Sequence, residues 1–171
     1  MSIPIGIFQI LADMRADPAV VSKAVEELGF ASYWVPEHSV MPVETDSPYT
    51  GDVDKEAPPT PDYLWQIPYP FTVLARASAT TSRIRLGTGV CLVPQHHPAM
   101  LANETASLDH FSGGRFNFGI GAGWHREQGE MLGVDFDHRW TQTKECLQII
   151  KELWVIQLIM LVVLEKVGIF I

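Results

Sequence analysis

The fold is decided by residues 83–124, which read RIRLGTGVCLVPQHHPAMLANETASLDHFSGGRFNFGIGAGW. Two apolar, glycine-containing strands are expected at residues 84–92 and 116–120. Between them, residues 98–111 carry apolar side chains at helical spacing, begin with a proline and end before Gly113 and Gly114. This order predicts one strand–helix–strand unit of a parallel sheet.

The same alternation continues on both sides of this unit. Strands are predicted at residues 3–10 and 33–37, and helices at 18–28, 71–81 and 141–154, the first of them capped by Asp17. Regular alternation of this kind predicts an α/β fold with a parallel sheet covered by helices. Two architectures remain open, an open flavodoxin-like sheet and a TIM (β/α)8 barrel. Because a whole barrel takes about 250 residues, four units in 171 residues are expected to form its first half.

Three ordered motifs resemble the bacterial luciferase-like oxidoreductases, and the likeness extends over residues 3–154. They are YWVPEH at 33–38, the run at 70–90, and LDHFSGGRFNFGIGAGW at 108–124. The resemblance is closest to the branch described as coenzyme F420-dependent (deazaflavin) oxidoreductases. It implies a luciferase-like TIM barrel in which a reduced FMN or F420 ring transfers hydride or, as in a monooxygenase, activates oxygen. The organic small-molecule substrate and the choice of cofactor remain open.

The resemblance also implies where the ring would lie, over the carboxyl ends of the strands. A bulge with a non-prolyl cis peptide bond is implied at Gly89 and Val90 in the third strand. The GAGW segment, Gly121, Ala122, Gly123 and Trp124, is similar to the family's ring-facing segment. Trp124 departs from the wider superfamily, in which some dehydrogenases place a catalytic acid there. Its indole is therefore expected to shape the site or to pack in the core.

Two side chains directly after the second strand are the catalytic candidates. His38 occupies a position that holds a histidine beside the reactive ring in some deazaflavin enzymes. Imidazole titrates near neutrality, so it suits proton transfer or stabilisation of a reduced flavin anion. Glu37 is expected to orient this histidine or to hydrogen-bond the cofactor. The alternative for both residues is a structural role at the end of the strand.

Other chemistries find little support in the sequence. GIGAGW is not a GxGxxG fingerprint, and neither a phosphate-binding GxxxxGK[ST] loop nor a GxSxG nucleophile elbow occurs. The histidines lack metal-ligand spacing, so no metal is expected. A net charge of −8 opposes nucleic-acid binding, and two distant cysteines suit a cytoplasmic protein without disulfides.

Residues 39–70 form a long acidic loop insertion with seven of the twelve prolines. Because it follows the second strand, the loop is expected at the catalytic face, as a lid or a wall for the substrate. Its aromatic side chains could line a pocket or pack on the scaffold. They are Tyr49, Tyr63, Trp65 and Tyr69.

The last segment, residues 155–171, is an atypical hydrophobic tail, whereas residues 1–154 follow the barrel pattern. Its uncharged run is shorter than the roughly 20 residues of a spanning helix, so a misassembled gene end is favoured over a membrane anchor. A truncated half barrel would expose sheet edges and apolar helix faces, which favours a homo-oligomer. An alternative function follows, that of an inert fragment or an accessory subunit that pairs through its open edges.

Overall fold

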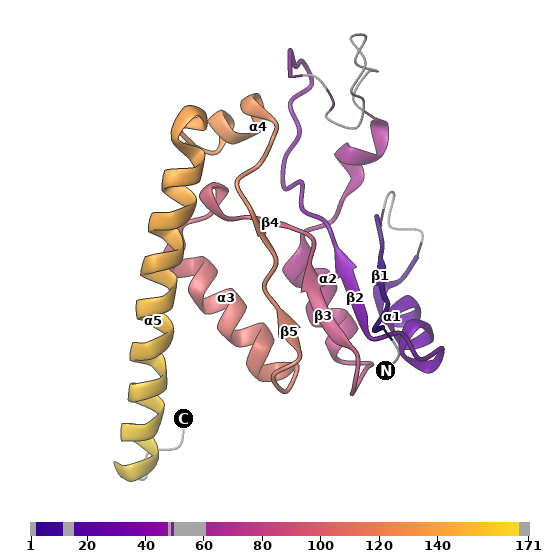
Figure 1. Ribbon diagram of the computed structural model, residues 1–171, viewed down its shortest axis with the longest axis vertical. Helices are drawn as coiled ribbons and strands as arrows, with labels where there is room; N and C mark the ends of the chain where they lie inside the picture. The colour runs from indigo at the N-terminus through magenta and orange to yellow at the C-terminus, as the bar shows by residue number, and fades with distance from the viewer. Residues whose placement is uncertain (1–2, 12–15, 48, 50–60, 168–171) are drawn as a thin grey trace.

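The computed structural model describes residues 3–11, 16–47, 49 and 61–167 (Figure 1). The strands are β1 Gly6–Phe8, β2 Ser32–Val35, β3 Arg85–Thr88, β4 Cys91–Leu92, β5 Phe116–Asn117 and β6 Ile120–Gly121. The helices are α1 Pro18–Glu27, α2 Pro70–Ser78, α3 Pro98–Phe111, α4 Arg126–Met131 and α5 Arg139–Val167. Short 3-10 helices cover η2 Asp62–Gln66, η3 Val93–Gln95 and η4 Phe136–His138.

The main sheet is parallel throughout, and its strands follow one another in chain order. Its spatial order is β1-β2-β3-β5, with Tyr33 of β2 in register with Ile7 on one side and Leu86 on the other. An open doubly wound sheet reverses its strand order at a switch point, whereas a barrel does not. The sequential order therefore confirms the predicted partial barrel, and the flavodoxin-like alternative is wrong.

The third and fourth strands are each divided in two at the carboxyl end of the sheet. The predicted strand 84–92 breaks at Gly89–Val90, where the peptide bond is cis, as the sequence resemblance implied. β4 and β6 then form a second parallel pair. The Gly119 carbonyl oxygen joins the two breaks because it accepts from the Thr88 hydroxyl at 2.7 Å and from the Cys91 N–H at 2.8 Å.

The core lies between the sheet and the helices, which contact one another in the order α1, α2, α3, α5 (Figure 1). Tyr33 and Leu86 from the sheet are fully buried there against Leu74 of α2 and Leu101 of α3. Burial of each large apolar side chain contributes about 1.5–3 kcal/mol to stability. Phe111, predicted on the buried face of α3, is instead 80% exposed, because it is the last residue of the helix and the buried face ends at Leu108.

Two predicted boundaries also differ from the structure. The predicted loop 39–70 contains η2, which buries Leu64. The last helix begins at Arg139 rather than at residue 141 and continues through residues 155–167. In the part of the chain that the structure describes, no helix combines the length and the apolarity needed to cross a bilayer.

Gly119 is a position where any side chain would be costly. A Cβ atom there would overlap the backbone carbonyl oxygen of Thr88, which cannot move without disturbing β3. We expect Gly119→Ala to lower the free energy of unfolding by about 1–3 kcal/mol, the usual cost of overpacking, measured by urea denaturation. Gly129→Ala is the control, because its added Cβ would meet its nearest atoms at 3.5 Å and alanine favours the helix. Equal losses in both variants would contradict the prediction.

Candidate functional site

The predicted site residues lie where the parallel strands end. Glu37 and His38 follow β2, and Trp124 follows β6. The carboxyl ends of parallel strands share one edge of the sheet, so these segments meet although they are far apart in sequence. The His38 and Trp124 rings are 6.1 Å apart between centroids in an edge-to-face arrangement, and Tyr49 makes a similar contact with Trp124 at 5.8 Å.

A small apolar shelf lies at the break of the third and fourth strands, where Val90 packs against Gly121. A Cβ atom on Gly121 would lie only 2.6 Å from Val90 Cγ2, so glycine allows the two segments to touch. Val90 is 39% exposed. The shelf therefore offers an open apolar surface next to the backbone of Gly121, which has no side chain.

The other residues predicted to contact the ring, Gly89, Ala122 and Gly123, do not belong to this shelf. The open side of Gly89 faces Phe8, which is 3.0 Å from where a Cβ atom would lie. Ala122 is buried, and Gly123 has a φ of +85°, a backbone conformation that favours glycine. These residues shape the strand end, while Val90 and Gly121 form its surface.

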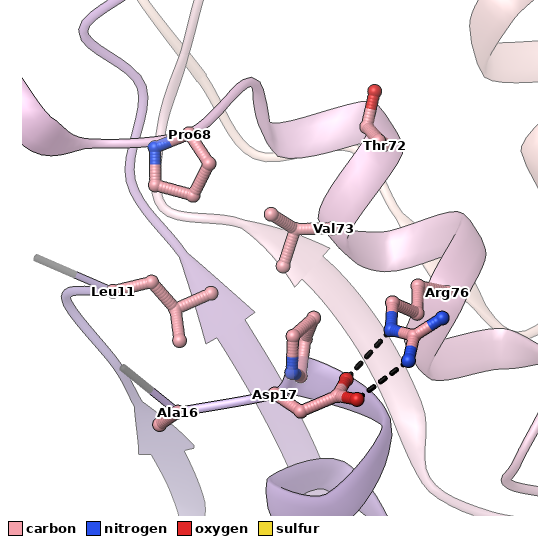
Figure 2. A pocket seen from close by; sticks show the side chains of 8 residues that line it. Leu11, Ala16, Asp17, Pro68, Thr72, Val73 and Arg76 are labelled. Atoms are coloured by element: carbon pink, nitrogen blue, oxygen red, sulfur yellow. Dashed lines mark hydrogen bonds and ion pairs between the residues drawn. The ribbon is translucent and has the colours of Figure 1, made fainter. Parts of the chain in front are cut away.

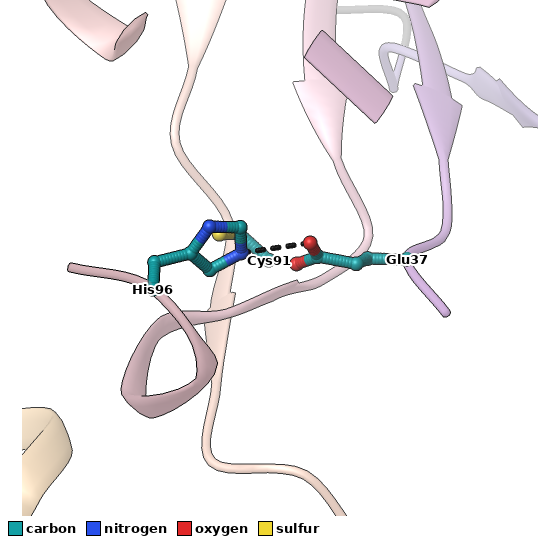
Figure 3. Close-up of side chains that lie close together, drawn as sticks. All are labelled: Glu37, Cys91 and His96. Carbon is teal, nitrogen blue, oxygen red and sulfur yellow. Dashed lines mark hydrogen bonds and ion pairs between the residues drawn. The ribbon is translucent and has the colours of Figure 1, made fainter. Parts of the chain in front are cut away.

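Glu37 is the centre of a buried polar network (Figure 3). One of its carboxylate oxygens accepts from the Leu92 N–H at 2.6 Å, and the other accepts from His96 Nε2 at 2.7 Å and from the Ser39 hydroxyl at 2.9 Å. Burial raises the pKa of Glu37, but the His96 imidazolium and these hydrogen bonds outweigh burial and lower it. In His96 burial lowers the pKa, but Glu37 outweighs that effect and raises it. The two groups form a buried ion pair.

Cys91 lies next to this pair, and its thiol, the Glu37 carboxylate and the His96 ring place candidate metal-ligand atoms within 4.8 Å of one another. The sequence predicted no metal site. Burial and the nearby Glu37 charge raise the pKa of Cys91 far above its ordinary value, so the thiol stays protonated. Both oxygens of Glu37 already accept hydrogen bonds. The arrangement is that of an ion pair that ties the end of β2 to β4 and to the segment after it.

His38 has a different partner from the one that the sequence suggested. Glu37 was expected to orient it, but the hydrogen bonds of Glu37 go to Leu92, His96 and Ser39. His38 Nδ1 instead lies 2.9 Å from Gln128 Oε1 of α4. Burial lowers the pKa of His38, and this effect outweighs the opposing influence of the Gln128 hydrogen bond and the Glu37 charge. His38 is therefore neutral at neutral pH.

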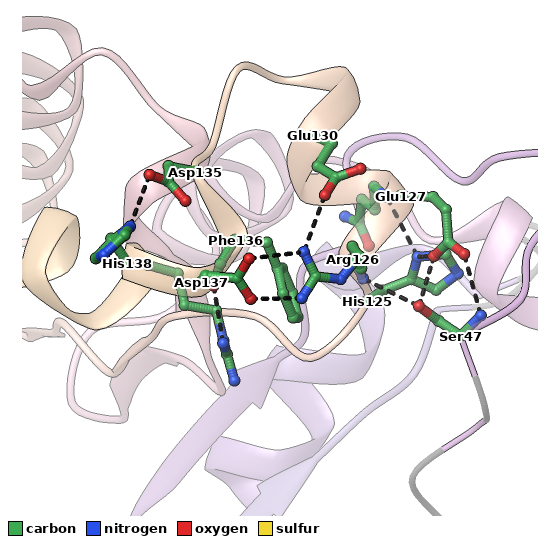
Figure 4. A network of polar contacts seen from close by, with 11 residues as sticks. Ser47, His125, Arg126, Glu127, Glu130, Asp135, Phe136, Asp137 and His138 are labelled. Carbon is green, nitrogen blue, oxygen red and sulfur yellow. Dashed lines mark hydrogen bonds and ion pairs between the residues drawn. The ribbon is translucent and has the colours of Figure 1, made fainter.

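A second set of contacts fastens the segment after β2 to the start of α4 (Figure 4). His125, the N-cap of α4, accepts from the Gln128 N–H at its Nδ1 and contacts the Thr45 hydroxyl with its Nε2 at 3.0 Å. Glu127 accepts from the N–H groups of Asp46 and Ser47 at 2.8 and 3.1 Å. The segment therefore lies against α4 at the strand ends.

Sequence reasoning missed Gln128, His96, His125 and Glu127 as members of this region. The only local signal is an acidic residue in the first turn of α4, which is typical of a helix start. The contacts themselves join residues 59 to 90 positions apart, and no local pattern encodes them.

A separate cavity of about 400 Å³ lies between the start of α1 and α2 (Figure 2). Asp17 and Arg76 form a two-bond ion pair across its wall, at 2.6 and 2.5 Å. The Arg76 guanidinium and the Ala19 N–H lower the pKa of Asp17 to about 2. None of the predicted site residues lines this cavity, so it is distinct from the region around His38.

The sequential parallel strand order defines a partial barrel of the (β/α)8 class, with polar and aromatic groups gathered at the carboxyl ends of its strands. Residues 17–157 match the family model of the luciferase-like monooxygenases, and the chain belongs to this family. The partial barrel is thereby placed among known relatives.

The chain spans about half the length of the curated relatives it matches. An uncharacterized protein of Mycobacterium tuberculosis is 37% identical over 151 residues, which cover 87% of this chain and 52% of that protein. Among solved structures, the oxygenating constituent of 3,6-diketocamphane monooxygenase from Pseudomonas putida, in complex with FMN, superposes with a TM-score of 0.70 at 21% identity. That match covers 90% of this chain and 40% of the other.

A second similar structure is that of a protein named for its dependence on coenzyme F420. The coenzyme F420-dependent tetrahydromethanopterin reductase from Methanopyrus kandleri has a TM-score of 0.56 at 25% identity, over 80% of this chain and 31% of its own. Structural neighbours of the chain therefore include both an FMN-bound monooxygenase and an F420-dependent reductase.

Proposed function

We propose that the chain supplies the ring-facing part of an oxidoreductase site that uses FMN or coenzyme F420. The observation that carries this proposal is the arrangement at the strand ends, where the His38 and Trp124 rings are in edge-to-face contact and Gly121, three residues before Trp124, packs against Val90. Membership of the luciferase-like monooxygenase family supports the reaction class. The cytoplasm, the compartment expected from the sequence, suits a reduced cofactor of this type.

The residues present fit the ring of such a cofactor. A planar ring needs an apolar surface that approaches closely, and the partly exposed Val90 beside Gly121 offers one where a larger side chain would intrude. Trp124 would hold an edge of the ring by aromatic contact. When bound, the ring would supply hydride transfer or, in the case of FMN, oxygen activation.

The side chains around the shelf would then act on the substrate. His38 is neutral and half-buried, so it can take up a proton from a substrate hydroxyl and return it. Trp124 and Tyr49 would keep water from this proton. Residues 46 and 47, in the described part of the acidic loop, contact Glu127 at the start of α4, and the acidity of this loop disfavours anionic substrates. A small neutral organic molecule is the substrate class that suits these charges.

The proposal is tested by fluorescence titration of the whole chain with FMN and, separately, with coenzyme F420. We expect saturable binding of one cofactor and at least a 5-fold weaker affinity in Trp124→Ala. Trp140→Ala is the matched control, because Trp140 is a tryptophan that is 65% exposed on α5. A folded chain that binds neither cofactor would overturn the proposal.

A second candidate is a noncatalytic subunit that pairs with another half barrel. It is favoured by the outer strand β1, which has only β2 as a neighbour in the described sheet. Around β1, Ile5, Phe8 and Ile10 are 62%, 52% and 42% exposed. Sedimentation of the chain with and without a carboxyl-terminal half from a family member would test this candidate. Activity that arises only in the mixture would favour it, whereas a monodisperse monomer that is active alone would contradict it.

A further inference from the structure

We infer that Gln128 is a positioning residue that holds the proton of His38 on Nδ1 and so leaves Nε2 as its proton-accepting atom. The inference rests on the proposed function, because it concerns the histidine that would act there. It names a residue and an atom that the sequence did not single out.

The side chain of Gln128 is held at both ends. It is completely buried, with Oε1 2.9 Å from His38 Nδ1 and Nε2 donating to Gln95 Oε1 at 3.2 Å. An amide oxygen only accepts hydrogen bonds, and an amide nitrogen only donates them. In the structure the Gln95 oxygen faces the amino group of Gln128, and the oxygen of Gln128 faces the His38 ring.

This orientation decides the tautomer of His38. Since Gln128 Oε1 can only accept, the hydrogen bond requires a proton on His38 Nδ1. Burial lowers the pKa of His38, so the neutral ring carries that single proton at neutral pH. The lone pair then resides on Nε2, at the opposite corner of the ring. Protonation of Nε2 would leave the Gln128 hydrogen bond in place, so the ring keeps its orientation through a proton-transfer cycle.

The neighbouring histidine helps to keep Gln128 in position and carries the opposite tautomer. Burial lowers the pKa of His125 despite the Glu127 carboxylate 3.3 Å from its Nδ1. The Gln128 N–H donates to the same Nδ1 at 3.2 Å, so the single proton of neutral His125 is on Nε2 and is donated to the Thr45 hydroxyl. His38 and Thr45 belong to the same segment after β2. Gln128 is thus joined to this segment directly through His38 and indirectly through His125.

The test is ¹⁵N NMR of the imidazole rings in the whole chain, because nitrogen shifts distinguish the two tautomers without any cofactor. His38→Gln assigns the resonances of His38. We expect the Nδ1–H tautomer in the wild type and a shift toward Nε2–H in Gln128→Met, which removes the acceptor. Gln128→Glu keeps an acceptor, so it should retain the Nδ1–H tautomer and raise the pKa of His38. Gln148→Met, an exposed change on α5, should alter neither.

Two outcomes would overturn the inference. One is an Nε2–H tautomer of His38 in the wild type, and the other is an unchanged tautomer in a folded Gln128→Met variant. The result is independent of the redox proposal, because the spectra are recorded without cofactor. If the tautomer depends on Gln128 while neither FMN nor F420 binds, the role of Gln128 stands and the proposed function fails.

Discussion

Replacing Glu37 by alanine is expected to lower the free energy of unfolding by about 3 kcal/mol, within the range for breaking a buried ion pair. The side chain is inaccessible to solvent and serves three donors from Leu92, His96 and Ser39. Its removal leaves the Leu92 N–H and the His96 ring without their acceptor in a buried region, which is costly. Urea denaturation at pH 6 measures the loss.

The stability contributed by this pair depends on pH in two directions. The folded pKa of Glu37 is below its ordinary 4.5, so its contribution is present above that value and is lost as the pH falls through the folded pKa. The folded pKa of His96 is above its ordinary 6.5, so its contribution is complete below that value and is lost as the pH rises through the raised pKa. The pair therefore stabilises the fold most between about pH 4.5 and 6.5.

An exposed ion pair provides the control. Arg126 and Asp137 are joined at 2.6 Å, but their side chains are 42% and 70% exposed. Solvent screens such pairs, so Asp137→Asn should leave the urea midpoint nearly unchanged. Equal destabilisation in Asp137→Asn and Glu37→Ala, or a Glu37→Ala variant as stable as the wild type at pH 6, would contradict the prediction.

Replacing His38 by glutamine is expected to lower turnover about 100-fold to 10,000-fold, the usual range for loss of a general acid or base. Glutamine fills much of the same space but cannot take up a proton. Because the proposed ring contacts are made by Val90, Gly121 and Trp124 rather than by His38, we expect the cofactor affinity to change less than 3-fold. Stopped-flow reduction of the oxidised cofactor by a panel of neutral alcohols measures the turnover.

The pH profile separates a proton acceptor from a structural residue at this position. The pKa of His38 is lowered by burial, so its neutral form persists below the ordinary value of 6.5. Turnover that needs neutral His38 should be constant near neutrality and fall as the pH drops through the lowered pKa. His97→Gln is the matched control, since His97 is exposed and makes no side-chain cap at the start of α3. A His38→Gln variant with wild-type turnover would remove His38 from the mechanism.

Much of the fold follows from local patterns. Glycine and proline mark the ends of α3, and Asp17 caps α1 through the Ala19 N–H at 2.9 Å, as its position predicted. These features depend on near neighbours in the chain, and so a single sequence contains them. The family resemblance, which includes the run at 70–90, also placed the cis bond at Gly89–Val90. Phe111 is an exception. Helical spacing places it on the buried face of α3, but spacing does not show where the elements that cover this face end.

The sequence by itself determined the alternation of strands and helices, the parallel sheet and the positions of His38 and Trp124 after their strands. Only the tertiary structure decided which groups those side chains meet. It paired Glu37 with His96 rather than with His38, and it brought Gln128 from 90 residues away to His38. Helical and strand periodicity specify which side of an element is buried. Hydrogen-bond partners across a barrel edge instead depend on how several elements pack together, and that information is not local.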